Sequence, residues 1–445
     1  MQNSLTSGST FKNLLRFSIP YLISCFLQTF YGLADLFIIG QFNGASAITA
    51  VSIGSQIMHM YTLITVGIAM GTTVLIGRSV GAGDKQKISR TIGTSTLLFA
   101  LYSIVTMGIL ILCIRGIVSV LSTPAEAVAE TQQYMLICFI GIPFIVAYNV
   151  LSGIFRGLGD TKSPMYFILA AGIINILLDL LLVGPFGMGA IGAALATVIS
   201  QGCSVVLALL FLRRQLGDIR FSREDFSLDR MLLRAILQIG LPVAFQDGLI
   251  QISFLIITRI ANGRGVEIAA AVGIVEKLIS FIFLVPSAML SAVAAISAQS
   301  IGAGEQERSR RTLRDALLIC MVYGVLVSVI CQFAAEEILG LFTKNEPQVI
   351  LLGSQYLHTY VIDTFFAGIH FCFSGFFTAY GKSTYSFIHN MISIVTARVP
   401  GAYLASVLFP LTLTPMGLAA PAGSLISALI CVFLYQRGRK KNFWS

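Results

Sequence analysis

Residues 50–57 read AVSIGSQI and residues 78–85 read RSVGAGDK, and both patterns return as AVGIVEKL at 271–278 and QSIGAGEQ at 299–306. The offset is about 221 residues for both pairs, and no insertion interrupts either copy. Because a repeat at this distance spans half of the chain, the sequence predicts two structurally equivalent halves.

The composition indicates that lipid is the solvent of this chain. Of its 445 residues, 56% are hydrophobic and only 11% are charged, which is more apolar surface than a water-soluble core can hide. Apolar stretches of about 20 residues, each long enough to span a bilayer as a helix, occur roughly twelve times. They are too long for the strands of a membrane barrel and lack their alternation. We therefore predict an all-α integral membrane protein, with twelve transmembrane helices in two pseudo-symmetric six-helix lobes, an arrangement that carriers commonly use.

The longest polar connection lies where the two repeats meet. It predicts an N-terminal lobe at 1–212, a cytoplasmic linker at 213–234 and a C-terminal lobe at 235–445. The GAG segments that begin at Gly81 and Gly302 lack the spacing of a nucleotide-binding loop, so we interpret them as tight turns that need glycine's positive φ. Without a nucleotide site, transport would take its energy from an ion gradient.

The net charge of +9 is distributed by loop and does not form one stripe. Most of the 29 Lys and Arg residues precede the first apolar stretch or follow an even-numbered one, and the opposite loops are nearly bare. This asymmetry predicts that both termini and the even-numbered loops are cytoplasmic. Anionic membrane lipid is the expected partner of these charges, and we expect no nucleic acid.

Polar side chains in the first and fifth apolar stretches gather on single helix faces. Gln28, Tyr31 and Asp35 are three and four residues apart, and Asn175 and Asp179 are four apart. At the repeat offset, Asp35 and Asp179 correspond to apolar or glycine positions, so the pair of carboxylates belongs to the N-terminal lobe alone.

Three further polar residues of that lobe extend this set: Asn149 in the fourth stretch, and Thr197 and Gln201 in the sixth. Two buried carboxylates that lie close together can retain a proton, and with amide and hydroxyl oxygens they can instead coordinate a hard cation such as sodium. An organic cation that competes for the same negative site would be exchanged for that ion. The alternative is that Asp35 and Asp179 are interhelical hydrogen-bonding groups without a transport role.

The C-terminal lobe has its own ionisable residues, namely Asp247, Glu276, Lys277, Asp363 and Arg398. A glutamate, a lysine and an arginine within one lobe favour a structural charge network, although a secondary role in transport stays open, above all for Asp247. The four histidines lack the spacing of a zinc site, and no catalytic triad or acidic metal-diphosphate motif occurs. We expect neither a resident metal nor a cofactor, and no enzyme activity.

The chain resembles the multidrug and toxic compound extrusion (MATE) family over essentially its whole length. The resemblance rests on the Ile-Pro at Ile19, the Leu-Pro at Leu241, the paired GAG loops and the segment SGIFRGLGDTKSP from Ser152. It implies two lobes around a central cavity and cation-driven export of lipophilic, often cationic compounds.

The residues resemble the prokaryotic DinF-like branch most closely. That resemblance implies a cation site formed by Asp35, Asn149, Asn175, Asp179 and Thr197. The NorM-like branch instead uses a glutamate in the seventh helix and an aspartate in the tenth. Here those acids are absent, which argues against a C-lobe sodium site of that kind, with Asp247 about one turn from the missing glutamate.

Together these observations predict a multidrug efflux transporter of the bacterial inner membrane. It would exchange lipophilic or cationic compounds for protons or sodium and act as a monomer. The alternative is a flippase for lipid-linked saccharides, which would need a basic central cavity; the acidic N-terminal lobe argues against it. The sequence leaves the substrates and the choice between proton and sodium open.

Overall fold

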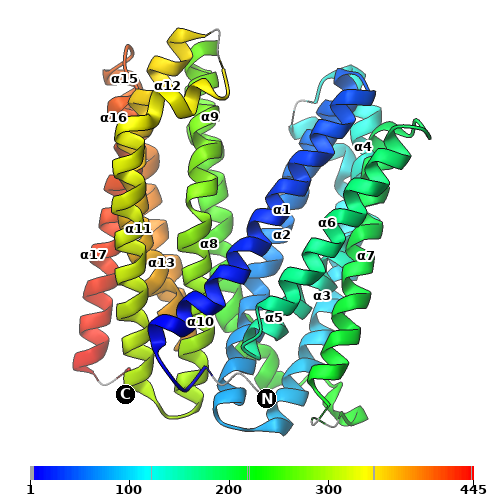
Figure 1. Ribbon diagram of the computed structural model, residues 1–445, viewed down its shortest axis with the longest axis vertical. Helices are drawn as coiled ribbons and strands as arrows, with labels where there is room; N and C mark the ends of the chain where they lie inside the picture. Colours follow the sequence, from blue (N-terminus) through cyan, green and yellow to red (C-terminus); the bar gives the residue numbers. More distant parts are fainter. Residues whose placement is uncertain are drawn as a thin grey trace. The chain divides into compact units, whose positions relative to one another are not determined.

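The computed structural model describes residues 5–121, 123–217, 219, 221–343, 346–441 and 443–444, and all of the regular secondary structure in these ranges is helical (Figure 1). Residues 218 and 220 of the predicted linker lie outside this description. The first half contains α1 (Thr10–Phe42), α2 (Ala45–Gly81), α3 (Lys85–Val120), η1 (Ala125–Ala127), α4 (Val128–Ile140), α5 (Ile142–Gly157), α6 (Lys162–Val183), α7 (Gly189–Gln215) and η2 (Arg223–Asp225). The second half contains α8 (Arg230–Asn262), α9 (Val266–Ile282), α10 (Leu284–Gly302), α11 (Gln306–Gly340), α12 (Pro347–Tyr360), α13 (Asp363–Ala379), α14 (Ser383–Ser393), η3 (Ile394–Arg398), α15 (Val399–Leu408), α16 (Thr414–Gly417) and α17 (Ala419–Lys440).

Within the described ranges, ten helical segments are long and apolar enough to cross a membrane, and two bent helix pairs bring the number to twelve. The pairs are 125–140 with α5, bent by 49°, and α12 with α13, bent by 42°. They are the fourth and tenth spans, which are equivalent positions in the two halves. Large apolar side chains such as Leu112 and Phe333 are 86% and 84% exposed, as expected for a surface that faces lipid. The predicted all-α membrane fold is confirmed.

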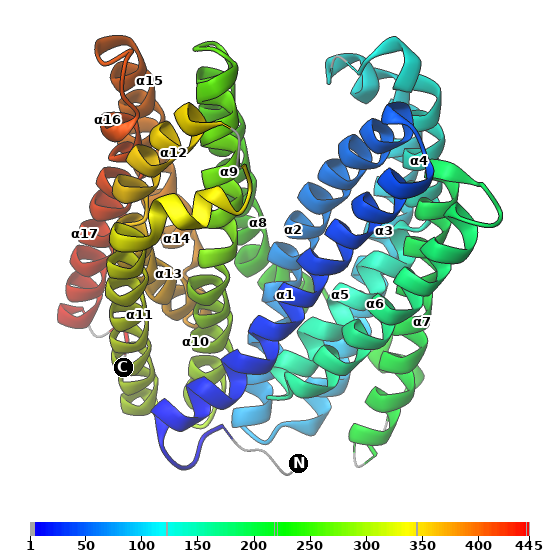
Figure 2. The ribbon, with the colours of Figure 1, turned by 45° about the horizontal axis from the view of Figure 1, so that its top comes forward.

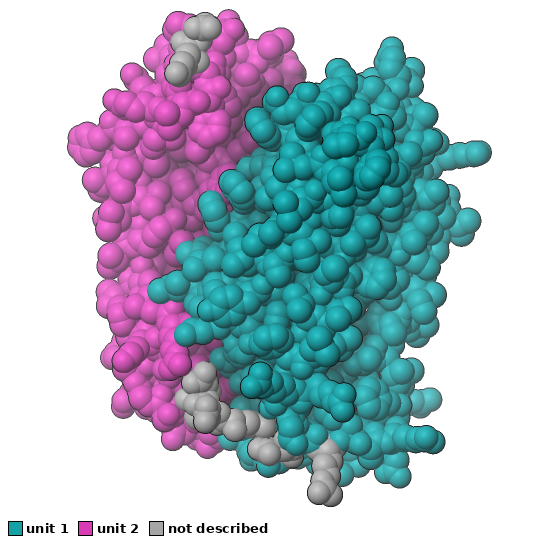
Figure 3. Space-filling model, turned by 45° about the vertical axis from the view of Figure 1, so that its right-hand side comes forward, with its two compact units in different colours: residues 1–4, 19–240 teal, residues 5–18, 241–445 magenta. Residues whose placement is uncertain are grey.

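The described chain forms two compact units, which Figure 3 colours separately. Unit 1 contains residues 19–240, and unit 2 contains residues 5–18 and 241–445. The predicted lobes are 1–212 and 235–445, and the two units differ from them in two places. The start of α1 clusters with unit 2, and the start of α8 clusters with unit 1. Each change of unit falls just before a proline inside a helix, Pro20 in α1 and Pro242 in α8.

The beginning of α8 belongs to unit 1 because two glycines let its backbone approach that of α2. A Cβ atom built on Gly240 would lie 2.3 Å from the carbonyl oxygen of Ile68, and one built on Gly71 would lie 2.2 Å from that of Ile236. Only glycine fits at both positions, so the two helices are in direct backbone contact.

Four loops, two in each half of the chain, end their helices with the same hydrogen-bonded turn. Gly83, Gly159, Gly304 and Gly381 all have positive φ, between 69° and 89°. In each, the residue after the glycine donates its N–H to a carbonyl five positions earlier, as Asp84 does to Ser79 at 3.0 Å. This pattern is the Schellman motif, and it confirms the prediction that the GAG segments are glycine turns.

In unit 1, α2 packs against α5, α6 against α7, and α4 against α7, as Figure 2 shows from a second direction. The described part of the linker also belongs to this unit. Oδ2 of Asp225 accepts hydrogen bonds from the N–H and the hydroxyl of Ser222, at 2.8 and 3.1 Å, and Nε of Arg90 lies 4.0 Å from Oδ1. The N–H of Ser222, with smaller contributions from its hydroxyl and from Arg90, lowers the pKa of Asp225 below the ordinary value.

In unit 2, both described ends of the chain are held by the beginning of α11. The guanidinium of Arg308 donates to the carbonyl oxygens of Leu5, Ser7 and Gly8 at 2.7–3.0 Å. Nη2 of Arg310 donates to the carbonyl oxygen of Trp444 at 3.0 Å. The indole of Trp444 is 1% exposed and donates to a backbone oxygen of α17 at 2.8 Å.

Candidate functional site

Asp35 lies at the centre of the buried polar residues of unit 1. Its side chain, on α1, is 5% exposed. The hydroxyl of Thr197 on α7 donates to Oδ2 of Asp35 at 3.4 Å. Asn175 and Asp179, one turn apart on α6, face the same carboxyl group. The structure therefore brings together Asp35, Asn175, Asp179 and Thr197 from three helices.

Among the described residues, three of the four carboxyl oxygens of this cluster lack donors. Neither Oδ1 nor Oδ2 of Asp179, nor Oδ1 of Asp35, receives a hydrogen bond, and both amide atoms of Asn175 lack partners among the described residues. Asp179 and Asn175 are 0% exposed, so water does not cover them. Two ionised carboxylates cannot donate to each other, and isolated buried charges are costly. The arrangement is therefore chemically complete only with a positive charge, either a proton on one carboxyl group or a bound cation.

Local sequence explains this placement. The α6 stretch AAGIINILLDLLLV is apolar except for Asn175 and Asp179, whose spacing of four puts both on one face of the helix. The same face carries Gly172, where a Cβ atom would lie 3.6 Å from the ring of Tyr31 on α1. Small residues at such a contact let two membrane helices approach closely.

The other predicted residues of this lobe lie in different surroundings. Nε2 of Gln201 donates to the hydroxyl of Tyr31 at 3.1 Å, so these two residues form a second link between α7 and α1. The amide of Asn149 donates to the carbonyl oxygen of Ile145 in its own helix at 2.8 Å and shows no contact with Asp35. Gln28 is half-buried.

Two residues near Asp35 were not predicted from the sequence. Tyr134 and Cys138 on α4 lie close enough to Asp35 to interact electrostatically with it, and the Tyr134 hydroxyl is 3.1 Å from that of Ser55. Both residues belong to an apolar stretch, where a tyrosine and a cysteine are ordinary core residues. Their one-turn spacing is the only signal that the sequence offered.

Among the described residues, no hydrogen bond or ion pair joins Asp247, Glu276 and Lys277 of the C-terminal lobe to one another. Lys277 is exposed, whereas its neighbour Glu276 is half-buried and accepts a 2.8 Å hydrogen bond from the hydroxyl of Thr258. Asp247 is half-buried and has no hydrogen-bond or ion-pair partner among the described residues.

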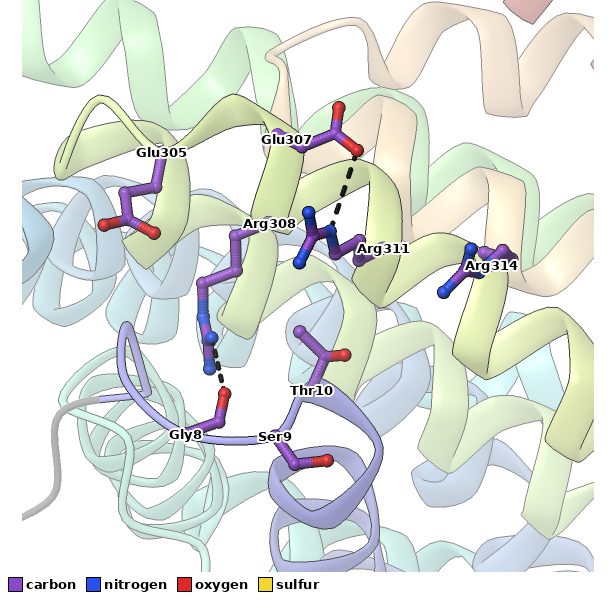
Figure 4. Close-up of a pocket in the computed structure, with 8 residues that line it drawn as sticks. All are labelled: Gly8, Ser9, Thr10, Glu305, Glu307, Arg308, Arg311 and Arg314. Atoms are coloured by element: carbon purple, nitrogen blue, oxygen red, sulfur yellow. Dashed lines mark hydrogen bonds and ion pairs between the residues drawn. The ribbon is translucent and has the colours of Figure 1, made fainter.

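A separate pocket of about 370 Å³ lies in unit 2 at the start of α11 (Figure 4). Figure 4 shows Arg308 directed at Gly8 and Arg311 directed at Glu307, at 2.7 and 3.7 Å. The pocket is lined by Gly8, Ser9, Thr10, Glu305, Glu307, Arg308, Arg311 and Arg314, and none of the predicted site residues is among them.

A duplicated series of membrane-spanning helices with buried carboxylates is the architecture of a multi-pass membrane transporter. A family model described as MatE matches residues 20–181 and again residues 242–404. The chain therefore belongs to the MatE family, and the two matches correspond to the two repeats.

Several relatives match this chain over nearly its full length. Probable multidrug resistance protein YoeA of Bacillus subtilis is 26% identical and covers 98% of this chain and 95% of its own. The FAD transporter of Shewanella oneidensis is 27% identical, with 98% and 96% covered. The multidrug export protein MepA of Staphylococcus haemolyticus is 26% identical, with 96% and 92% covered.

Solved structures agree in fold. A crystal structure of MATE in complex with MaL6 has a TM-score of 0.91 at 23% identity and covers 99% of this chain and 98% of its own. An MOP superfamily transporter from Pyrococcus furiosus, described as having a binding pocket of reverse polarity, has a TM-score of 0.90 at 22% identity, with 99% of this chain and 98% of its own covered. At this identity the likeness concerns the fold.

Proposed function

We propose that this protein is an antiporter that exports lipophilic or cationic small molecules in exchange for protons or sodium ions. The observation that carries the proposal is the cluster of Asp35, Asn175, Asp179 and Thr197, in which three of the four carboxyl oxygens lack donors among the described residues. A positive charge is what this cluster requires, so a small cation and a positively charged compound would compete for it. Competition for one site couples the two movements.

Both coupling ions suit the residues present. A proton needs one carboxyl oxygen, and sodium needs several oxygen ligands, which two carboxylates, the Asn175 carbonyl and the Thr197 hydroxyl can supply. Asn149 on α5 uses its amide nitrogen for the bond to Ile145, so its Oδ1 is the atom that could join such a ligand set. Tyr31 and Gln201 would orient α1 against α7 through their own hydrogen bond.

The proposal includes a setting for this activity. The distribution of Lys and Arg over the loops favours an inner-membrane protein with both termini in the cytoplasm, in contact with anionic lipid, that acts as a monomer. No cofactor other than the coupling ion is required.

The direct test uses purified protein in proteoliposomes loaded with ethidium or norfloxacin. Efflux is measured under an imposed pH gradient and, separately, under an imposed sodium gradient, and the gradient that drives efflux identifies the coupling ion. Asp35→Asn should abolish the gradient-driven component of efflux. Glu130→Gln, which changes a half-buried acid of the same unit, is the control. Undiminished efflux by a folded Asp35→Asn variant would refute the proposal.

A second candidate follows from the relative named FAD transporter, whose cargo is an anionic dinucleotide. FAD and a lipid-linked saccharide therefore belong in the same assay as competing substrates. Gradient-driven movement of either, without movement of ethidium or norfloxacin, would favour that function or the flippase alternative.

A further inference from the structure

Unit 2 contains a second set of ionisable side chains, two of them buried and one half-buried, which the proposed function does not use. Glu276 lies on α9, Asp363 begins α13, and Arg398 ends the π-helical segment η3. Asp363 is 0% exposed and Arg398 is 7% exposed. Both carboxyl groups interact electrostatically with the guanidinium of Arg398.

Arg398 is held by aromatic groups rather than by the acids. Its Nη2 donates to the hydroxyl of Tyr360 on α12 at 2.6 Å, and its guanidinium lies 4.6 Å from the centre of the Phe254 ring. No ion pair within 4.0 Å joins Arg398 to Glu276 or Asp363 in the described part of the chain. The arginine thus carries a positive charge that acts on both acids, although neither acid forms an ion pair with it.

The hydrogen bonds of this group are incomplete. Oδ1 and Oδ2 of Asp363, Oε1 of Glu276 and Nε of Arg398 have no partner within hydrogen-bonding distance, although Ser424 on α17 faces Asp363. Structural charge networks inside proteins normally satisfy all of their polar atoms, because each one left open is costly. An open network is therefore typical of a site that gains or loses something.

The balance of charge indicates what it gains. With both acids ionised, the three side chains carry one net negative charge, which a single proton would neutralise. Sodium fits less well, because the guanidinium of Arg398 is already a cation within this group and would repel a second one. A proton needs only one of the open oxygens.

The remaining polar neighbours do not supply that charge. Tyr356 and Tyr360 on α12 approach the acids but are neutral phenols. His389 on α14 uses both ring nitrogens, at 2.7 Å from the Ser427 hydroxyl and 3.0 Å from that of Ser374. His370 on α13 lies against His389, with ring centres 5.6 Å apart, and also close to Arg398, so a charge on it would meet another positive charge.

The backbone also marks this position. Arg398 lies in a π-helical stretch, a rare arrangement that is found mostly at functional sites. Pro400 follows two residues later, and its missing N–H removes one of the regular helical hydrogen bonds there.

We infer that Glu276 and Asp363, arranged around Arg398, form a second proton-binding site in the C-terminal half of the protein. One proton neutralises the group, and it is bound only while both acids are present. When either acid is absent, the remaining carboxylate and Arg398 neutralise each other and no proton is bound. The inference does not depend on the ion coupling proposed for Asp35.

Infrared difference spectroscopy of the full chain tests it, between about pH 8 and about pH 5, a range in which buried carboxyl groups take up protons. The C=O band of protonated carboxyl groups is measured in an Asp35→Asn/Asp179→Asn/Asp247→Asn background, which removes the two acids of the candidate site and the half-buried Asp247 of unit 2. We expect this background to keep a band equal to one proton. Glu276→Gln and Asp363→Asn should each remove it completely, and the two together should remove no more than either alone.

Glu336→Gln, which changes an exposed acid of the same unit, is the control and should leave the band intact. Folding of each variant is checked by thermal unfolding. If Asp363→Asn does not fold, Glu276→Gln alone decides, because either substitution removes the one excess negative charge that the proton neutralises. A band that survives in a folded Glu276→Gln variant, or no band in the background, would overturn the inference. Loss of ethidium efflux without a change in this band would concern the proposed function only.

Discussion

The hydroxyl of Thr197 on α7 donates a hydrogen bond of 3.4 Å to Oδ2 of Asp35 on α1. Oδ1 of the same carboxyl group has no hydrogen-bond partner among the described residues. Thr197 also donates to the carbonyl oxygen of Ala193 at 3.0 Å. One hydroxyl is thus divided between its own helix and the acid, and a cation at Asp35 would compete with it as a partner.

Thr197→Val should weaken ion binding at Asp35. The substitution keeps the shape of the side chain and removes the hydroxyl oxygen, and a hydrogen bond to a charged group is worth about 1.5–3 kcal/mol. We expect the ion concentration for half-maximal efflux to rise roughly tenfold, with Thr197→Ser close to wild type. Equal behaviour of the valine and serine variants would contradict a ligand role for this hydroxyl.

Asp35→Asn and Asp179→Asn should not be additive. Because the two carboxyl groups face each other and act on one positive charge, either change alone removes the site. We expect each single variant and the double variant to show the same residual gradient-driven efflux in proteoliposomes. A double variant that is clearly slower than both singles would mean that the acids act separately.

Gly240→Ala should destabilise unit 1, because the new Cβ atom would lie 2.3 Å from the carbonyl oxygen of Ile68. Overpacking of this kind costs about 1–3 kcal/mol. Gly248→Ala is a matched control in the same helix, since nothing lies within 4 Å of that Cβ position. Thermal unfolding in detergent should show a clear loss for Gly240→Ala and little change for Gly248→Ala.

The linker turn at Asp225 should weaken in acid. Its pKa is lowered in the folded protein, so its charged form stabilises the fold above the ordinary aspartate pKa of about 3.9. That stability is lost as the pH falls through the lower folded-state pKa. Amide hydrogen exchange at residues 222–227 should accelerate there, and Asp225→Asn should show fast exchange already at neutral pH.

Glu224→Gln, a change of the exposed neighbouring acid, should retain the slow exchange of the wild type at neutral pH. If Asp225→Asn exchanged as slowly as this control, the carboxylate of Asp225 would not be what holds the turn.

Much of the fold follows directly from the sequence. Apolar length determines the number of spans, and repeat-related glycines such as Gly83 and Gly304 determine the turns, because these signals are local. The grouping of Asp35 with Asp179 was also predictable, since acids buried in lipid must face polar partners. The roles assigned to these residues stay predictions.

Other features depend on contacts between distant segments. Nothing in the sequence around Ser18 indicates that residues 5–18 cluster with unit 2, because the deciding hydrogen bonds come from Arg308. Similarly, Asn149 matched a motif, but its amide bonds to its own helix, a choice that depends on side-chain orientation rather than residue type. Glu276 and Lys277 are adjacent in the sequence, but successive residues of a helix lie on different faces, so one is half-buried and the other exposed.

The chain has a single tryptophan, and its indole is enclosed by the rings of Phe376, Phe377 and Tyr380. Tryptophan fluorescence of this protein therefore originates from one point, near the beginning of α11 and the end of α17. A buried indole emits at shorter wavelength than a hydrated one, so a red shift would report the release of Trp444 while circular dichroism still follows the helices. The two signals give a label-free way to distinguish local opening of this corner from unfolding of the whole molecule.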